Sequence, residues 1–300
     1  MYASELNAAH IWRPAAFLQV AGPDAFNFLQ GQFTNDLRLL DNQPAVYGLW
    51  LEQKGHVLAD SFVLKAEGGA FWVASYFSPA EALCERLRAY LVADDATVED
   101  CTAGCAGLTL VGSDAKKMAE TFGVALSFAG RRTEFPSVEL LFSAETLPAV
   151  EAQMAALNLP PLPAGDMELS RIKANIPAVP RDIGPDELAN EGGLETVAIS
   201  FTKGCYLGQE IMSRLKSMGK VRRSLLRVTG TGAPPAVPMA LFNGPKKMGE
   251  LRSVAVDGDG FVGLALLTLL GLDRCPGLSI EPGGTPVVQL EEVKVTRPPW

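Results

Sequence analysis

The sequence predicts an α+β protein in which two mixed α/β modules are followed by a C-terminal β-barrel. Strand-like runs alternate with amphipathic helical patterns up to residue 157, and this alternation occurs twice. From Leu225 onward helical patterns almost disappear, and short β-rich runs alternate with turns rich in glycine and proline. A chain of 300 residues, 48% of them hydrophobic, is also long for a single core. We therefore expect three domains.

The first module is expected to begin with a short strand followed by a helix. The apolar run Phe17–Val20 is typical of a strand. In the next sequence, GPDAFNFLQG, Pro23 suits the first helical position, Asp24 suits the first turn, and Gly31 can end the helix.

An antiparallel meander should follow, because three strand-like runs are separated by the sequence QKGH and by a turn at Gly68-Gly69. The expected strands are Ala45–Leu51, Val57–Leu64 and Ala70–Ser75. A helix that starts at Ser78-Pro79 should cover this sheet, because its apolar residues recur at helical spacing. These residues are Leu83, Leu87, Tyr90 and Leu91.

The second module repeats this pattern more briefly. Strands are expected at Gly107–Val111 and Val138–Phe142, and helices over 113–122 and 146–157. The proline-rich segment 160–185 should thread between the modules around one brief helical stretch near 167–173. Such chain crossings are where clefts occur.

The last part of the chain is punctuated by the turn sequences GTGAPP, FNGPKK, VDGDG and EPGGTP. We interpret Asp257-Gly-Asp259-Gly260 as a hairpin turn and not as a calcium loop, because the residues after it supply no further ligands. We expect residues 1–224 to form the two modules, interleaved along the chain (about 1–44 with 105–165, and 45–104 with 166–224). The barrel is expected over 225–300.

Composition excludes several classes of function. Five scattered cysteines predict reduced thiols, and two histidines leave little material for a zinc site, so we expect no metal site. The net charge of −8 argues against direct nucleic-acid binding. The N-terminal sequence shows neither a basic leader nor an apolar leader region, and the longest apolar run is about half of the ~20 residues that a membrane span needs. We expect a cytoplasmic protein that does not enter the membrane.

The sequence FTKGCYLGQE at 201–210 places a cysteine among a lysine, two glycines and a carboxylate. Lys203 would favour the thiolate of Cys205, because a neighbouring cation lowers the pKa of a thiol. Glycines allow close approach of a ligand to the backbone, while Gln209 and Glu210 can offer an amide and a carboxylate to a heterocycle. The alternative is that Cys205 is a small buried apolar residue next to ordinary turns. Between 203 and 227 seven basic residues stand against one acid, Glu210, which makes this segment the most positive part of the chain.

Three motifs carry a resemblance to a known family. KGCYLGQE resembles the K-G-C-Y-x-G-Q-E signature of the YgfZ family of folate-binding proteins, which are related to the aminomethyltransferase (T-protein) of glycine cleavage. GPDAFNFLQGQFTND, which starts at Gly22, is similar to that family's N-terminal motif, and ELSRI, which starts at Glu168, is similar to its central motif. Together the motifs span roughly residues 20–225.

The resemblance implies a three-domain ring that binds tetrahydrofolate or another reduced folate at its centre. It also implies an accessory role in the assembly or repair of iron–sulfur clusters in client enzymes, such as ones that modify tRNA. The folate-binding residues that it implies or that the loop chemistry favours are Thr34, Asn35, Asp36, Arg171, Lys203, Tyr206, Gln209 and Glu210. Cys205 is the candidate reactive thiol, and the basic segment 214–227 could attract client or assembly proteins.

The chain departs from the family pattern at two points. Lys173 replaces a glutamate that would contact the pterin in relatives. The aminomethyltransferase carries two adjacent aspartates after a glycine turn, whereas Ala59 and Asp60 occupy these positions here. We therefore do not favour an enzyme. The alternative is an aminomethyl or one-carbon transferase similar to the T-protein, with Asp60 as its catalytic candidate.

Overall fold

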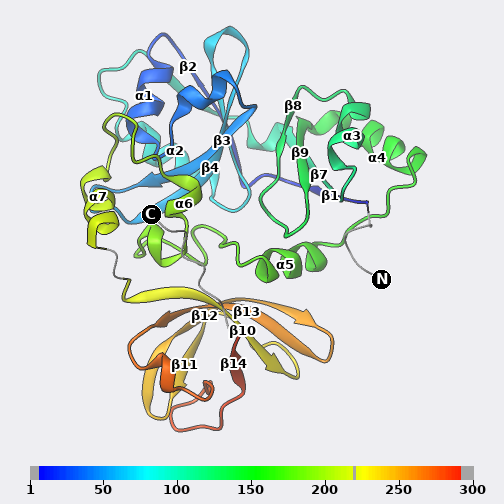
Figure 1. Cartoon of the computed structure of the whole chain (residues 1–300). Coiled ribbons are helices and arrows are strands. Elements are labelled where there is room, and N and C mark those ends of the chain that lie inside the picture. Colours follow the sequence, from blue (N-terminus) through cyan, green and yellow to red (C-terminus); the bar gives the residue numbers. More distant parts are fainter. Residues whose placement is uncertain (1–6, 219–220, 292–300) are drawn as a thin grey trace.

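The computed structural model describes residues 7–218 and 221–291, which form three β-sheets with helices packed around two of them (Figure 1). The strand orders are β3-β4-β5-β2-β6, β1-β7-β9-β8 and β11-β12-β13-β10-β14. No helix in the described ranges is both long and apolar enough to cross a membrane.

The first sheet contains the expected meander. Its strands are β2 (Ala16–Ala21), β3 (Ala45–Leu51), β4 (Val57–Lys65), β5 (Phe71–Ser75) and β6 (Thr97–Asp100). Helices α1 (Ala25–Gln32) and α2 (Ala80–Arg88) pack on one face, where Leu29, Leu83 and Leu87 are fully buried with Trp50. The predicted helix and its Leu83–Leu87 face are therefore confirmed, because that spacing places both side chains over the sheet.

The second sheet consists of β1 (Ala8–Trp12), β7 (Cys105–Val111), β8 (Leu126–Ala129) and β9 (Ser137–Ser143). Helices α3 (Ala115–Phe122) and α4 (Leu147–Ala156) share its core. Of the N-terminal strands, β1 pairs with β7, whereas β2 pairs with β5 and β6. We expected 1–44 to pair with 105–165. Of the described residues of that stretch, only β1 pairs with the second sheet, whereas β2 and α1 lie with the first.

The C-terminal sheet is formed by β10 (Arg223–Thr231), β11 (Met239–Asn243), β12 (Lys246–Asp257), β13 (Gly260–Thr268) and β14 (Val288–Leu290). It curls strongly in Figure 1. The segment 278–279 pairs with both edge strands of this sheet. Ser279 forms backbone hydrogen bonds with Phe242 of β11, and Leu278 forms them with Val288 of β14. The expected hairpin turn is confirmed, because Asp257 and Gly260 are opposite each other at the end of β12 and β13.

The connection between the first two sheets and the C-terminal sheet contains three helices. These are α5 (Ala164–Lys173), α6 (Glu195–Ala198) and α7 (Gln209–Met218). Its apolar residues form one core with Leu49 and Leu51 of β3 and with Leu225 and Leu264 of the C-terminal sheet. The segment 164–218 therefore packs against two sheets, which places its motifs at their junction (Figure 1).

Candidate functional site

The loop that carries Cys205 packs against the end of the first sheet. The Leu207 amide donates to the carbonyl of Gly31, at the end of α1. Gly208 has a φ of +82°, and a Cβ on it would lie 2.9 Å from the carbonyl oxygen of Glu52. Only glycine satisfies both conditions, because a side chain would be strained at this φ and would clash with the β3–β4 turn.

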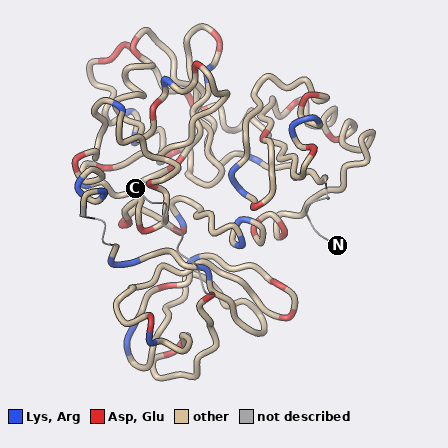
Figure 2. Tube along the Cα trace, viewed as in Figure 1, with Lys and Arg blue, Asp and Glu red and all other residues tan. Residues whose placement is uncertain are grey.

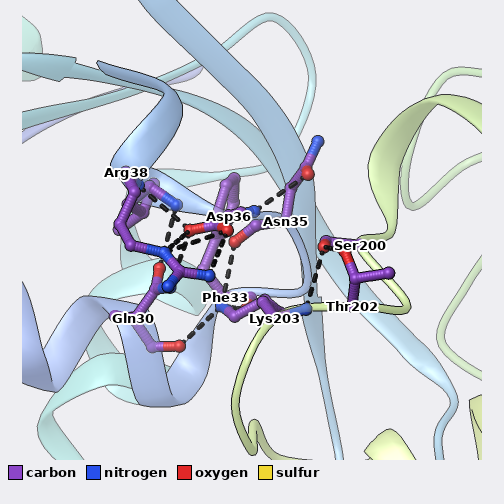
Figure 3. A network of polar contacts seen from close by, with 9 residues as sticks. Gln30, Phe33, Asn35, Asp36, Arg38, Ser200, Thr202 and Lys203 are labelled. Atoms are coloured by element: carbon purple, nitrogen blue, oxygen red, sulfur yellow. Dashed lines mark hydrogen bonds and ion pairs between the residues drawn. The ribbon is translucent and has the colours of Figure 1, made fainter. Parts of the chain in front are cut away.

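Lys203 anchors the loop to the C-terminus of α1 (Figure 3). Its buried Nζ donates to three backbone carbonyls around the C-terminus of α1: Gln30 at 2.6 Å, Phe33 at 2.7 Å and Asn35 at 2.9 Å. A cation is favourable there because the last carbonyls of a helix lack partners within the helix and carry partial negative charge. Burial lowers the pKa of Lys203 to about 8. The ammonium is thus turned toward α1 and fixes the two motifs to each other.

Cys205 is the one exposed thiol among the five cysteines of the chain. Cys84 and Cys105 are buried, and Cys101 and Cys275 are half-buried. The interpretation of Cys205 as a buried apolar residue is therefore wrong. Arg214, one of the seven basic residues between 203 and 227, is paired with the one acid of that stretch, because its guanidinium lies 2.9 Å from the carboxylate of Glu210.

The Thr34-Asn35-Asp36 segment is bonded to protein groups on all sides. Thr34 is fully buried and donates to the carbonyl of Ala198 at 2.7 Å. Asp36 caps the short 3₁₀ helix Leu37–Asp41, and the bonded Arg38 guanidinium holds the pKa of Asp36 well below its usual range. Asn35 donates from Nδ2 to the carbonyl of Tyr47 at 2.8 Å. This segment therefore links the Lys203 anchor to strand β3.

A second cluster lies around Asp60, next to this segment. Asp60 is buried, and its carboxylate accepts hydrogen bonds from Tyr47 at 2.8 Å, Ser78 at 2.8 Å and Ser75 at 3.1 Å. Burial raises the pKa of Asp60 in spite of these bonds. The Cζ atom of Arg131 lies 4.3 Å from the centroid of the Tyr47 ring.

Neither Tyr47 nor Arg131 was predicted from the sequence. Tyr47 lies in a strand where aromatic residues are ordinary, and Arg131 is contributed by the loop between β8 and β9, which is 71 positions after Asp60 in the chain. Only the fold brings them together.

Ala59 points away from this cluster. In a strand successive side chains face opposite sides of the sheet. Ala59 is opposite Trp50 in the β3–β4 ladder and is buried with it in the core beneath α1 and α2. Of the two positions that correspond to the adjacent aspartates of the T-protein, only Asp60 faces the cluster.

The remaining predicted residues lie in different surroundings. Arg171 is 1% exposed and uses its donors on protein groups, namely Glu168, Asp182, Ser253 and the carbonyl of Ile176. Tyr206 is buried, which raises its pKa to about 12, and its hydroxyl has no hydrogen-bond partner among the described residues. Gln209 is half-buried at the start of α7. Lys173 forms a 2.8 Å ion pair with Asp257 of β12.

The basic segment 214–227 is divided between surface and interface. Figure 2 shows basic residues along α7 and at the start of β10. Arg223 and Arg227 are paired with Glu191 and Glu291, whereas Lys216 and Arg222 are exposed. Lys216 lies over the ring of Phe201, 4.3 Å from its centroid. The basic surface available to a partner is therefore limited to α7 and Arg222 and does not run along the whole segment.

Comparison with known proteins agrees with these motifs. Residues 15–145 match the family model described as the GCVT N-terminal domain. The chain is 30% identical to the iron-sulfur cluster assembly factor IBA57 of Homo sapiens, over 83% of this chain and 74% of that protein. It is 26% identical to the tRNA-modifying protein YgfZ of Klebsiella pneumoniae, over 78% of this chain and 75% of that protein.

The fold has a counterpart among solved structures. The aminomethyltransferase T of the glycine cleavage system from Bartonella henselae superposes with a TM-score of 0.78, over 97% of this chain and 86% of that chain, at 16% identity. This similarity shows the fold and not the reaction. Together with the relatives in sequence, it shows that the chain belongs to the YgfZ/IBA57 family, which is related to the glycine cleavage aminomethyltransferase.

Proposed function

We propose that this protein is a folate-binding accessory factor that supports the assembly or repair of iron–sulfur clusters in client enzymes, including ones that modify tRNA. The names of its relatives support the class of process. One observation on this chain carries the proposal: its single exposed thiol, Cys205, is presented by a loop that the buried Lys203 anchors to the Thr34–Asp36 segment.

The chemistry of Cys205 suits an iron–sulfur process. Thiolates are the ligands that iron–sulfur clusters use, and a thiol at the surface can reach the iron of a cluster or a client thiol. An anchored loop holds the sulfur in one place, which reduces the ordering that binding would otherwise require. The cluster is cargo in this proposal, and Cys205 is its contact on this chain.

The Tyr47–Asp60 cluster fits a reduced folate. A carboxylate can accept about four hydrogen bonds, and Asp60 accepts three from protein hydroxyls. One acceptor position therefore remains for an N–H of the pterin ring, and Tyr47 is half-buried beside it. When bound, a reduced folate supplies one-carbon or redox chemistry. Asp60 and Tyr47 would orient its ring.

The test is a titration of the purified protein with tetrahydrofolate under anaerobic conditions, followed by calorimetry. We expect saturable heat for the wild type and weaker binding for Asp60→Asn, because an amide replaces one acceptor oxygen with a donor. Lys65→Met is the matched control, since Lys65 forms an exposed ion pair with Asp41 on the outside of the first sheet. The folate part of the proposal is wrong if the wild type gives no saturable signal.

A one-carbon transferase is the second candidate, and Asp60 is the observation that favours it. A buried carboxyl with a raised pKa is suited to hold or accept a proton near neutral pH. Asp36 is unsuited to that role, because its bond to Arg38 lowers its pKa. Turnover of methylenetetrahydrofolate by the wild type that is lost in Asp60→Asn would favour this candidate.

A further inference from the structure

Arg131 belongs to a loop of the second sheet, whereas Asp60 and Tyr47, which it approaches, belong to the first. It lies in the connection between β8 and β9 of the second sheet, yet its guanidinium carbon is 4.3 Å from the centroid of the Tyr47 ring in the first. Its backbone N–H also donates to the hydroxyl of Tyr76 at 3.3 Å. The cluster is therefore incomplete without the second sheet.

The neighbours of Arg131 hold this connection in place. The Arg132 guanidinium packs over the rings of Trp12 and Tyr76, at 4.3 and 4.2 Å, and lies 3.6 Å from the buried Glu139. Thr133 shares a 2.7 Å hydrogen bond with Ser170 of α5. Contacts on three elements thus position Arg131 before any ligand binds, which is the condition for a precise binding group.

The charge of Arg131 is not used in an ion pair with another described residue. Within 4.0 Å its guanidinium meets no acidic oxygen in the ranges 7–218 and 221–291, in contrast to Arg132. Asp60 cannot serve as a bidentate partner, because three protein hydroxyls already occupy its oxygens. The Arg131 side chain is only half-buried, and a guanidinium carries five N–H donors.

An acceptor group at the Tyr47 hydroxyl and a donor group over the Tyr47 ring therefore lie beside one half-buried aromatic residue. This pair complements a heterocycle whose edge carries both N–H groups and a carbonyl oxygen, as the lactam edge of a pterin does. Arginine is suited to such a role because its planar fork donates in a fixed direction and packs on aromatic rings.

We propose that Arg131 is a specificity-determining residue that donates to the ring carbonyl of the ligand while Asp60 accepts from a ring N–H. The inference rests on the proposed folate binding. It states that Arg131 contacts the heterocycle of the folate and not its glutamate tail. Lys cannot replace it fully, because an ammonium lacks the planar fork.

The test compares two ligands in anaerobic calorimetry: tetrahydrofolate, and a tetrahydropterin that lacks the aminobenzoyl-glutamate tail. Arg131→Gln should weaken the binding of both by the same factor, about tenfold or more, because a bond to a charged donor is lost. Arg131→Lys should recover only part of the affinity. Arg274→Gln is the control, since Arg274 is 88% exposed in the C-terminal region and should bind as the wild type does.

The outcomes separate this inference from the proposed function. If Arg131→Gln weakens tetrahydrofolate alone, Arg131 contacts the tail and the inference is overturned. If neither ligand is affected, Arg131 takes no part in recognition, although folate binding stands. If the wild type binds neither ligand, the proposed folate binding itself fails. Thermal unfolding of each variant shows that a change in affinity does not come from loss of the fold.

Discussion

Among the individual residues, Cys205 differs from the other four cysteines because it is exposed to solvent. Burial raises the pKa of Cys84 and Cys101, and raises that of Cys105 to about 12. Cys275 is half-buried, and its thiol donates to the carbonyl of Gly277 at 3.0 Å. A thiol reacts as its thiolate and only where a reagent can reach it.

We therefore expect Cys205 to be alkylated first when native protein is treated with limiting iodoacetamide. Peptide mass spectrometry across pH 6–9 ranks the five cysteines, and a sample in denaturant shows that all five peptides are detected. Equal or faster labelling of Cys275 or Cys101 would contradict the assignment of Cys205 as the accessible thiol.

Ala59 is a second residue whose surroundings decide the effect of a substitution. Ala59→Asp restores the pair of aspartates of the T-protein in the sequence, but it places a carboxylate in the core with Trp50. Because the side chains of this cluster are apolar, we expect a loss of about 3 kcal/mol or more in the free energy of unfolding. Denaturant unfolding measures this loss, and Ala59→Val is the apolar comparison. A variant as stable as the wild type would show that Ala59 does not face the core.

The sequence motifs pointed to the buried residues that hold the segments of the site in contact. They did not point to the half-buried residues beside Asp60. The glycines, Lys203 and Thr34 are specified because each makes a contact that other residue types cannot make in that place. Tyr47 and Arg131 carry no local signal, because their proximity depends on how the second sheet packs against the first. Alternation along β4 was the overlooked signal that separates Ala59 from Asp60.

At the scale of elements, the Lys203 anchor joins the C-terminus of α1 to the loop before α7. Its three hydrogen bonds replace contacts that water would make with the same carbonyls. Helix α7 also packs on the β3–β4 turn, since a Cβ on Gly55 would lie 3.0 Å from Ile211 and Met212. The loop is thus held at both ends, which leaves Cys205 exposed on a fixed base.

Lys203→Met should destabilise the protein by about 3 kcal/mol, because it leaves buried carbonyls without a charged donor. It should also increase the susceptibility of the 201–208 loop to proteolysis. Lys65→Met, which removes an exposed ion pair, should cost no more than about 1 kcal/mol. The two variants are compared by denaturant unfolding and limited proteolysis. Equal stabilities would show that the anchor contributes nothing.

Most elements of the first two modules follow from periodicity, but short edge strands do not. Strands β1 and β8 were not predicted, because AAHIW and LSFA are brief and carry no clear alternation. They are strands because β7 and β9 offer them hydrogen-bonding edges. Tertiary pairing, not local preference, decides such segments.

At the scale of the whole molecule, ion pairs join the connecting segment to the C-terminal sheet. Arg252 of β12 and Arg223 of β10 pair with Glu187 and Glu191. Arg171 of α5 bonds to Asp182 and to Ser253 of β12. These contacts surround the apolar core that the two parts share, so the junction combines packing with charge.

This junction predicts a dependence of stability on pH. The pKa of Glu187 is lowered overall. Burial alone would raise it, but the hydrogen bond to Arg252 and the charges of the neighbouring arginines outweigh the effect of burial. A lowered pKa means that the unfolded chain binds the proton more readily, so this stabilisation is present above pH 4.5 and is lost as pH falls through the folded-state pKa. Glu187→Gln should be less stable at pH 7 and should lose less stability between pH 5 and 3.

Chemical unfolding at several pH values between 3 and 7 measures both effects. Glu281→Gln is the control, because Glu281 forms no ion pair among the described residues and should not change the slope. Parallel curves for the wild type and Glu187→Gln would contradict the assigned role of this ion pair.

The central claim is that Cys205 connects this fold to iron–sulfur chemistry, and one measurement tests it most directly. A tRNA-modifying enzyme with an oxidatively damaged iron–sulfur cluster is incubated with iron, sulfide and reductant, and the recovery of its activity is followed with and without this protein. We predict faster recovery with the wild type and with Cys101→Ser, and none above background with Cys205→Ser. Recovery with Cys205→Ser equal to that with the wild type would contradict the account.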